Sequence, residues 1–336
     1  MPQREARFEE YADAVCAEIR ERREEIAKTL SVNTLYIGGG TPSVLPLDVL
    51  SRIVSAVLDR RWDEFTVEVN PEDIVEKGEE YVLGLKELGV NRISMGIQSF
   101  DDGILRWMNR RHDSAGAEEA FRILRRCGIG IISIDLIFGL SLLSDAVWAD
   151  TIDKALALGP EHISAYQLSV EEGSALEKLI AQGKVAEATD EQCRRQYDYL
   201  CSRLAQAGYR HYEISNFALP GQEAIHNSAY WKRVPYVGLG PGAHSLSAGS
   251  VRSWNTATLW SYSREEEVLT PEDIRVERIM LPLRTDTGLP ESELRSLADP
   301  ATVDRLLSAG ALVRTGNIRI PEDHFFISDK IIRELI

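Results

Sequence analysis

Short apolar runs alternate with longer amphipathic stretches through most of the chain. In the first such stretch Phe8, Tyr11, Ala12, Val15 and Ile19 fall on one helical face, and similar patterns recur later. Strands separated by helices at roughly 30-residue intervals predict successive βαβ units and a parallel sheet. The predicted strands are Thr34–Ile37, Phe65–Val69, Arg92–Ile97, Ile129–Ile137, His162–Leu168 and Arg210–Ile214.

The predicted strands are nearly continuous apolar runs, most clearly within Ile129–Ile137. Such runs are typical of parallel strands that are covered on both faces. We therefore expect an α/β fold, a barrel or part-barrel, with a doubly wound open sheet as the alternative. In a (β/α) barrel each helix follows a strand, whereas this chain opens with a helical pattern. Either the barrel is incomplete by nature, or its first strand precedes Met1.

The pattern changes after about Ser261. Three short helical patterns, two β-like pieces and a last helix from Ser328 predict a small winged-helix-like domain. The expected division is residues 1–260 for the barrel with its extension and residues 261–336 for the small domain. Many winged helices bind DNA, but this segment has no dense basic face. The helical patterns lie around Val276–Leu283, Glu291–Leu297 and Ala301–Leu307, and the β-like pieces at Leu312–Arg314 and Ile318–Ile320.

The chain has 336 residues and a net charge of −15, from 38 Lys and Arg against 53 Asp and Glu. Such a surface repels phosphate backbones, which argues against nucleic acid as a partner. We find no run of about 18 apolar residues and no signal-peptide pattern. The four cysteines lie far apart, unlike a secreted disulfide framework. These features predict a cytoplasmic globular protein with no integral membrane segment, and they leave its oligomeric state open.

Three glycines, Gly38, Gly39 and Gly40, follow the first predicted strand directly and precede Thr41. Glycines at the C-terminal end of a strand let a ligand approach the backbone, and α/β proteins build their sites at that end. The N–H groups can hold a carboxylate, and Thr41 can add a hydroxyl contact. A plain tight turn is the alternative, because the spacing matches neither a dinucleotide fingerprint nor a P-loop.

Polar side chains also mark the ends of the next three strands. Glu68 stands near the end of the second, and Gln98 follows the third with an amide that can donate and accept. Asp135 lies in the apolar fourth strand, where an unpaired carboxylate is costly. An exposed strand-end charge is the alternative for Glu68, and Arg111 is interpreted as part of a solvated basic cluster. Stability does not require polar groups at four successive strand ends, whereas a ligand site does.

A series of motifs resembles the radical S-adenosylmethionine family of the heme chaperone HemW and oxygen-independent coproporphyrinogen III oxidase. The resemblance covers nearly the whole chain, including the small C-terminal domain. It implies a partial (β/α) barrel that holds a [4Fe–4S] cluster and S-adenosylmethionine at its open mouth. The matching segments are residues 35–42, 68–71, 91–100, 135–140, 165–168, 212–218, 226–231 and 238–245.

The resemblance also implies roles for particular residues. The glycines and Thr41 would bind the methionine part of S-adenosylmethionine, and Glu68, Gln98, Arg110 and Asp135 would contact the rest of it. The motif that begins at His226 is associated with heme in the family. Imidazole is a common axial ligand of heme iron, so His226 is a heme candidate. The alternative is that His226 caps a turn beside Trp231.

Two departures from the family pattern stand out. Ser141 replaces the usual proline after Gly-Leu, which is a minor change. The Cys-x3-Cys-x2-Cys loop after the family's first strand has no counterpart, and Cys16, Cys127, Cys193 and Cys201 do not replace it. The missing cysteines and the missing first strand belong to the same segment. We therefore expect a chain that begins at an internal methionine, with a naturally cluster-free relative as the alternative.

The resemblance predicts a heme chaperone that binds heme and delivers it to recipient hemoproteins. The alternative within the family is oxidative decarboxylation of coproporphyrinogen III in porphyrin biosynthesis. The motif from His226 to Trp231 and the absence of a longer N-terminal extension favour the chaperone. A third hypothesis is a non-catalytic, cluster-free ligand-binding protein. Whether the chain is an enzyme is left open, because no cluster ligands are present to deliver an electron to S-adenosylmethionine.

Overall fold

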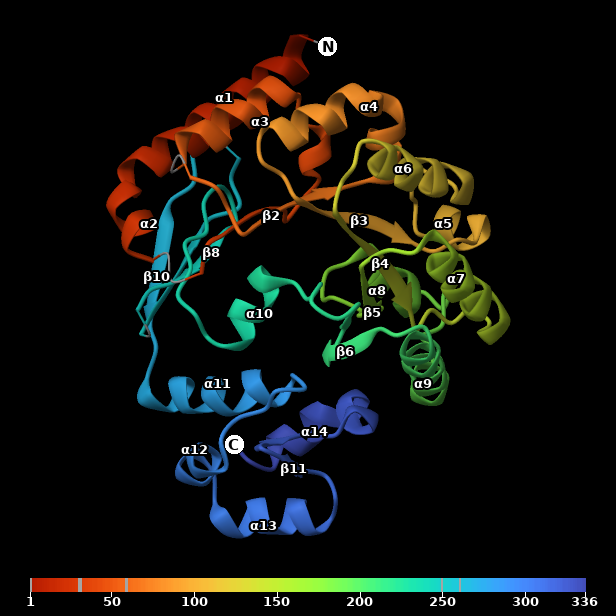
Figure 1. Cartoon of the computed structure of the whole chain (residues 1–336), viewed down its shortest axis with the longest axis vertical. Coiled ribbons are helices and arrows are strands. Elements are labelled where there is room, and N and C mark those ends of the chain that lie inside the picture. Colours follow the sequence, from red (N-terminus) through yellow and green to blue (C-terminus); the bar gives the residue numbers. More distant parts are fainter. Residues whose placement is uncertain (1, 30–31, 58–59, 249, 260) are drawn as a thin grey trace.

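The computed structural model describes residues 2–29, 32–57, 60–248, 250–259 and 261–336 (Figure 1). A curved seven-stranded sheet with the order β1-β2-β3-β4-β5-β7-β6 forms a half-barrel, which confirms the predicted partial barrel. Strands β1 to β5 are parallel, and β7 is antiparallel to both of its neighbours. The strands are β1 (Thr34–Ile37), β2 (Glu64–Val69), β3 (Arg92–Gln98), β4 (Ile131–Phe138), β5 (His162–Gln167), β6 (Arg210–Glu213) and β7 (Asn216–Ala218).

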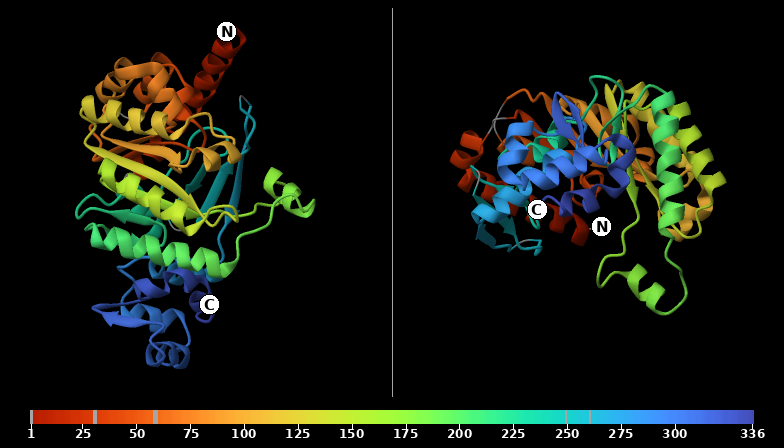
Figure 2. Two further views of the ribbon diagram at one scale, coloured as in Figure 1. Left: turned by 90° about the vertical axis from the view of Figure 1, so that its right-hand side faces the viewer. Right: turned by 90° about the horizontal axis from the view of Figure 1, so that it is seen from below.

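Helices cover the outer face of the sheet (Figures 1 and 2). Several begin at side-chain caps, as at Asp113, whose carboxylate accepts the Gly116 N–H, and at Ser144. Short α8 has no buried residue and stands away from the barrel in Figure 2. The helices are α1 (Pro2–Glu21), α2 (Arg23–Thr29), α3 (Leu47–Ala56), α4 (Pro71–Glu87), α5 (Asp102–Trp107), α6 (Ser114–Arg126), α7 (Asp145–Leu158), α8 (Ala175–Ala181), α9 (Asp190–Gln206) and α10 (Ile225–Trp231).

The two faces of the sheet differ in chemistry. On β3, Ile93, Met95 and Ile97 are fully buried, and Ile132 and Ile134 of β4 are equally buried. Side chains alternate along a strand, so the residues between these positions point to the opposite, inner face. The apolar core therefore lies between the sheet and its outer helices, and the inner face of the half-barrel is left to polar residues.

The C-terminal region has the predicted order of elements. Three helices precede a two-stranded antiparallel hairpin, and a last helix follows. None of the described helices is both long and apolar enough to span a membrane. The elements are α11 (Pro271–Leu283), α12 (Glu291–Leu297), α13 (Pro300–Ser308), β11 (Val313–Thr315), β12 (Asn317–Arg319) and α14 (Ser328–Arg333), with 3-10 turns at Pro42–Val44 and Glu322–Ile327.

A three-stranded antiparallel sheet, β8 (His244–Leu246), β9 (Val251–Asn255) and β10 (Arg264–Val268), was not predicted from the sequence. Its last two strands pair along their length, with Val268 opposite Val251. The sheet therefore spans the expected domain boundary, and position 260 itself lies outside the described residues. We propose that the small C-terminal domain begins at α11 rather than at residue 261.

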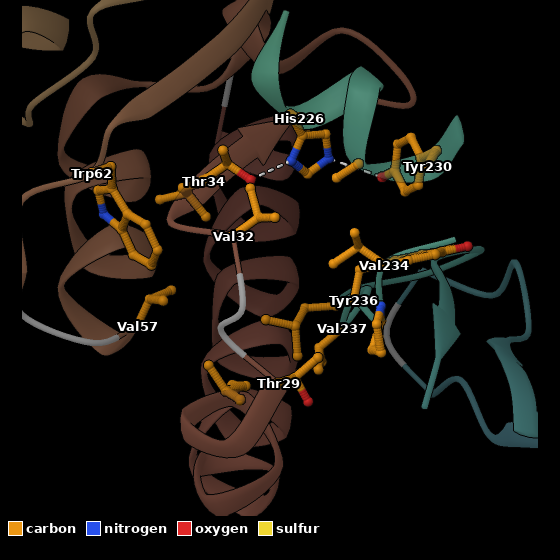
Figure 3. Close-up of a pocket in the computed structure, with 15 residues that line it drawn as sticks. Thr29, Val32, Thr34, Val57, Trp62, His226, Tyr230, Val234, Tyr236 and Val237 are labelled. Atoms are coloured by element: carbon orange, nitrogen blue, oxygen red, sulfur yellow. Dashed lines mark hydrogen bonds between the residues drawn. The ribbon is translucent and has the colours of Figure 1, made fainter. Parts of the chain in front are cut away.

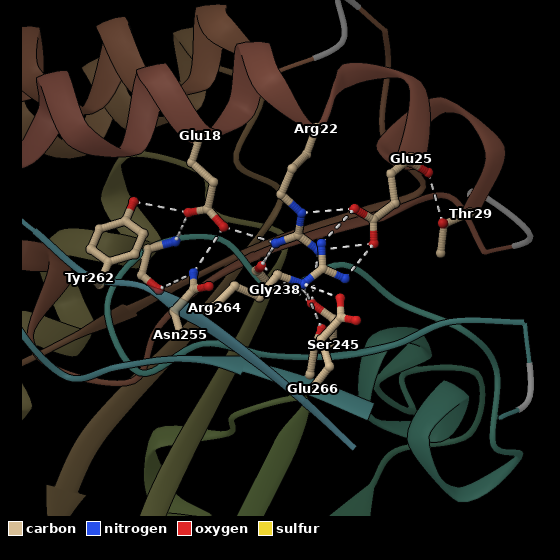
Figure 4. A network of polar contacts seen from close by, with 12 residues as sticks. Glu18, Arg22, Glu25, Thr29, Gly238, Ser245, Asn255, Tyr262, Arg264 and Glu266 are labelled. Carbon is tan, nitrogen blue, oxygen red and sulfur yellow. Dashed lines mark hydrogen bonds and ion pairs between the residues drawn. The ribbon is translucent and has the colours of Figure 1, made fainter. Parts of the chain in front are cut away.

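A buried ion-pair network ties this small sheet to helix α1 (Figure 4). Arg22, only 7% exposed, pairs with Glu18 at 2.8 Å and donates to the Gly238 carbonyl at 2.7 Å and to Ser245 Oγ at 3.1 Å. Glu18 also accepts from the Gly240 N–H at 2.7 Å. Further donors to Glu18 are Asn255 Nδ2 at 2.8 Å and Tyr262 Oη at 2.9 Å. Glu18 of α1 and Arg22, which directly follows α1, thus hold the loop before β8 in place.

Candidate ligand site at the mouth of the half-barrel

The inner-face positions of β1 to β4 carry a continuous set of polar groups. Tyr36 on β1, Glu68 on β2, Ser94 on β3 and Asp135 on β4 all belong to the inward-pointing set. Glu68 lies opposite Ser94 in the β2–β3 register, and the Ser94 hydroxyl lies 3.3 Å from the nearer Asp135 carboxylate oxygen. The parallel register therefore brings the predicted strand-end acids Glu68 and Asp135 to one end of the sheet.

The glycine loop closes over Glu68. One carboxylate oxygen accepts from Tyr36 Oη at 2.6 Å, and the other accepts from the Gly39 N–H at 3.0 Å. A Cβ at Gly38 would collide with the Tyr36 ring and lie 2.5 Å from the Glu68 carboxylate, so any other residue there would displace these side chains. At Gly39 and Gly40 the space beyond the backbone is open to 4 Å. The loop therefore presents accessible backbone next to a fixed carboxylate.

Arg110 and Gln98 line the adjoining part of the mouth. The Arg110 guanidinium donates to Asn70 Oδ1 at 2.8 Å and to the Gly96 carbonyl at 3.0 Å, while its buried Nε has no partner among the described residues. Gln98 follows a register irregularity in β3 and has φ +70, an unusual conformation for a non-glycine residue. Asn70 Nδ2 in turn lies 3.5 Å from Thr41 Oγ1. The predicted site residues are thus linked across the first three strands.

Arg111, the neighbour of Arg110, points elsewhere. Its side chain is 57% exposed and pairs with Glu72 at 2.9 Å and Asp73 at 3.1 Å. This arrangement agrees with its interpretation as part of a solvated cluster.

Two acids on the sheet have raised pKa values. Burial raises the pKa of Asp135 to about 7, and the charge of Glu68 adds to the effect, whereas hydrogen bonds from Ser164 and Ser94 oppose it. Burial likewise raises the pKa of Glu213, on β6, to about 7. Glu213 is 1% exposed, and its Oε1 has no partner in the described part of the chain. A neutral carboxylic acid at Asp135 adds donor capacity to the site.

Replacing Glu213 with glutamine should stabilise the protein increasingly as the pH rises from about 5 to about 8. Glutamates in unfolded chains ionise near ~4.3, so between that value and about 7 the folded state binds the extra proton. The penalty for ionising Glu213 is absent at low pH and complete above the folded pKa. The variant's advantage in free energy of unfolding should grow by roughly 2–3 kcal/mol. Urea denaturation at both pH values measures this, with the exposed Glu187→Gln as control; equal changes in both variants would contradict it.

His226 lies on the first turn of α10 and faces β1 (Figure 3). Its Nδ1 is 2.8 Å from Thr34 Oγ1, its Nε2 is 2.8 Å from Tyr230 Oη, and its ring stacks on Tyr36 with centroids 5.0 Å apart. Burial lowers the pKa of His226 to about 4, so the ring is neutral at neutral pH. The side chain does not cap a turn, because Glu64 of β2 accepts the backbone N–H groups at the start of α10.

The cavity beside His226 is small and largely apolar. It measures about 90 Å³, and its lining includes Val32, Trp62, Tyr236 and Val237 (Figure 3). Cavities that enclose drug-sized ligands measure about 300–1,000 Å³, so a whole heme does not fit beside His226 without movement. The opposite side of α10, at Trp231, lines a larger cleft of about 460 Å³ that extends to α11.

The four cysteines do not fit a cluster. All are free thiols on helices or at a helix end, and Cys16, Cys127 and Cys193 are buried. Burial raises the pKa of all four, that of Cys201 to about 12, whereas iron binds the thiolate. Among the described residues, no group of three or more His, Cys, Asp and Glu side chains is arranged to hold a metal ion. The residues present therefore do not supply the ligands of a [4Fe–4S] cluster.

His226 stacks on the ring of Tyr36. At one end of the sheet the structure brings together the other predicted site residues, Gly38, Gly39, Gly40, Thr41, Glu68, Gln98, Arg110 and Asp135. Sequence reasoning missed Tyr36 and Ser94, which are ordinary strand residues by composition. The signal that points to Tyr36 is its position. It lies two residues after Thr34, and therefore on the same inner face of the strand, and two residues before Gly38.

Comparisons with known proteins agree with this architecture. Residues 6–155 match the family model described as the radical SAM superfamily. The heme chaperone HemW of Synechocystis sp. is 35% identical over 303 residues, covering 86% of this chain and 72% of the relative. HemW of Bacillus subtilis is 34% identical, covering 84% and 77%. The structure of the radical SAM enzyme coproporphyrinogen III oxidase (HemN) from Escherichia coli superposes with a TM-score of 0.80, covering 98% and 83%, at 21% identity. This last likeness concerns the fold alone.

Proposed function

The chain belongs to the HemW family of radical S-adenosylmethionine proteins, and we propose that it is a heme chaperone with an S-adenosylmethionine site at the mouth of its half-barrel. In this role it binds heme as cargo and delivers it to recipient hemoproteins. The observation that carries the proposal is the convergence of the open glycine loop with Glu68, Gln98, Arg110 and Asp135 on one edge of the sheet.

The groups at this edge suit S-adenosylmethionine chemically. The open backbone at Gly39 and Gly40 and the Thr41 hydroxyl would hold the methionine carboxylate and amine. Arg110, whose Nε lacks a partner in the described region, offers a buried donor, and Asp135 and Gln98 offer partners for ribose hydroxyls. When bound, S-adenosylmethionine supplies a reactive sulfonium. This chain's residues would bind and orient it.

After anaerobic reconstitution with iron and sulfide, this chain should show no brown [4Fe–4S] absorbance. The reason is that its four thiols are separated and have raised pKa values. The measurement is the visible spectrum together with iron and sulfide analysis. A cluster spectrum with about four irons per chain would contradict this account of the cysteines.

Heme is proposed to bind at α10. Its motif presents His226 on one side and Trp231 on the other, each next to a cavity. A neutral imidazole can coordinate iron without first losing a proton. Iron ligation at Nε2 would replace the hydrogen bond to Tyr230, whose side chain is 39% exposed.

Replacing His226 with alanine should shift or weaken the Soret band of the heme-loaded protein, because the axial ligand is lost. Absorbance spectra at equal heme loading measure the effect, and His324→Ala, in the distant 3-10 turn, is the matched control. An unchanged Soret band in His226→Ala would reject this histidine as the ligand.

Product analysis with coproporphyrinogen III separates the chaperone from the decarboxylase alternative. Calorimetry with S-adenosylmethionine and hemin separately tests the non-catalytic binding alternative.

A further inference from the structure

A continuous series of contacts joins the glycine loop to the histidine on α10. The Gly39 N–H donates to Glu68 Oε2 at 3.0 Å, and Glu68 Oε1 accepts from Tyr36 Oη at 2.6 Å. The Tyr36 ring stacks on His226 at 5.0 Å with an angle of 20° between the planes. Only the side chains of Glu68 and Tyr36 thus lie between the Gly39 N–H and the His226 ring.

The geometry of β1 makes Tyr36 the pivot of this series. Thr34 and Tyr36 lie on the same face of the strand, so β1 holds both the partner of His226 Nδ1 and the ring that His226 covers. The Tyr36 ring and the Glu68 carboxylate both pack closely against Gly38, where an added Cβ would collide with them. A ligand that takes over the Glu68 carboxylate removes the acceptor of the Tyr36 hydroxyl, and one that takes over the Gly39 N–H removes the contact that holds the other oxygen of that carboxylate.

We propose that Tyr36 is a positioning residue that couples the glycine-loop site to the His226 pocket. A ligand at the loop changes the environment of His226, and occupancy of the pocket changes the affinity of the loop by the same factor, because binding coupling is reciprocal. The contacts of Tyr36 supply the physical connection that such coupling requires. The identity of the loop ligand as S-adenosylmethionine rests on the proposed function, whereas the connection does not.

The first test uses the full chain without any ligand. Backbone amides are labelled with 15N and histidine rings with 13C, and the signal of His226 among six histidines is identified by its loss in His226→Gln. Tyr36→Phe keeps the stacked ring and removes only the bond to Glu68. The proposal predicts that both the Gly39 amide and the His226 ring signals shift. The control is Tyr209→Phe, which removes another buried hydroxyl, bonded to the Pro160 carbonyl, and should shift neither. If Tyr36→Phe leaves either signal in place, the connection is refuted.

The second test adds S-adenosylmethionine, with calorimetry to establish saturation. The wild-type His226 ring signal should shift on saturation, and in Tyr36→Phe that shift should fall by at least about half while S-adenosylmethionine still binds. An equal shift in both proteins, or none in the wild type at saturation, would overturn the coupling. If the wild type does not bind S-adenosylmethionine, the proposed cofactor assignment fails, and the ligand-free test alone decides on the connection.

Discussion

Replacing Arg22 with alanine should lower the free energy of unfolding by about 3–5 kcal/mol, the range for breaking a buried ion pair by removing one partner. Arg22 and Glu18 are 7% and 10% exposed, respectively. The substitution leaves the Glu18 carboxylate without its cation and leaves the Gly238 carbonyl and Ser245 hydroxyl without the guanidinium. Because these partners fix the loop before β8, the three-stranded sheet should loosen with the loss of stability.

Urea denaturation followed by circular dichroism measures this effect. Arg122→Ala is the matched control, because Arg122 pairs with Glu118 at 2.6 Å in the same i, i+4 spacing but is 54% exposed. The control should change the free energy of unfolding by less than about 1 kcal/mol, as for most surface ion pairs. Similar losses in the two variants would contradict the assignment of Arg22 as the anchor of the small sheet.

Replacing Arg110 with alanine should weaken S-adenosylmethionine binding at least tenfold, as expected when a buried charged donor worth about 1.5–3 kcal/mol is removed. One guanidinium nitrogen, Nη2, donates to both Asn70 Oδ1 and the Gly96 carbonyl, and the buried Nε is without a partner among the described groups. Its loss removes a donor from the site and also releases Asn70, which lies next to Thr41.

The adjacent Arg111→Ala variant is the control for this prediction. Both substitutions remove one positive charge from the same loop, so a general electrostatic effect would appear in both. Arg111 is exposed and pairs with Glu72 and Asp73 outside the site, so its replacement should alter the dissociation constant less than about threefold. Calorimetry on both variants decides the matter, and equal losses would remove Arg110 from the site.

The parallel part of the fold was predictable because it rests on apolar periodicity. The predicted strand starts and ends lie within two residues of those observed for β1 to β5, and the inner-face acids Glu68 and Asp135 were identified from their positions. The small sheet escaped prediction for a physical reason. Strand β10 is exposed throughout and consists of Arg264, three glutamates and Val268, so its backbone pairing to β9 leaves no apolar pattern.

The contacts that hold the small sheet and organise the site depend on residues far apart in the chain. In sequence, Glu18 and Arg22 form an i, i+4 pair of the kind found on exposed helices. They are buried because Gly238, Ser245 and Asn255, more than 200 positions away, lie against them. Tyrosine is common in strands, so the sequence alone gives no reason to assign Tyr36 to a ligand site. Only the pairing of β1 with β2 shows that its hydroxyl reaches Glu68.

The most direct test of the proposed function is an equilibrium titration of the full chain with hemin, followed at the Soret band. We expect saturable binding of one heme per chain, with a spectrum that changes in His226→Ala, and release of that heme to an added apo-hemoprotein. Absorbance that rises in proportion to hemin without saturation, as for hemin in buffer, would contradict the proposal that this chain carries heme.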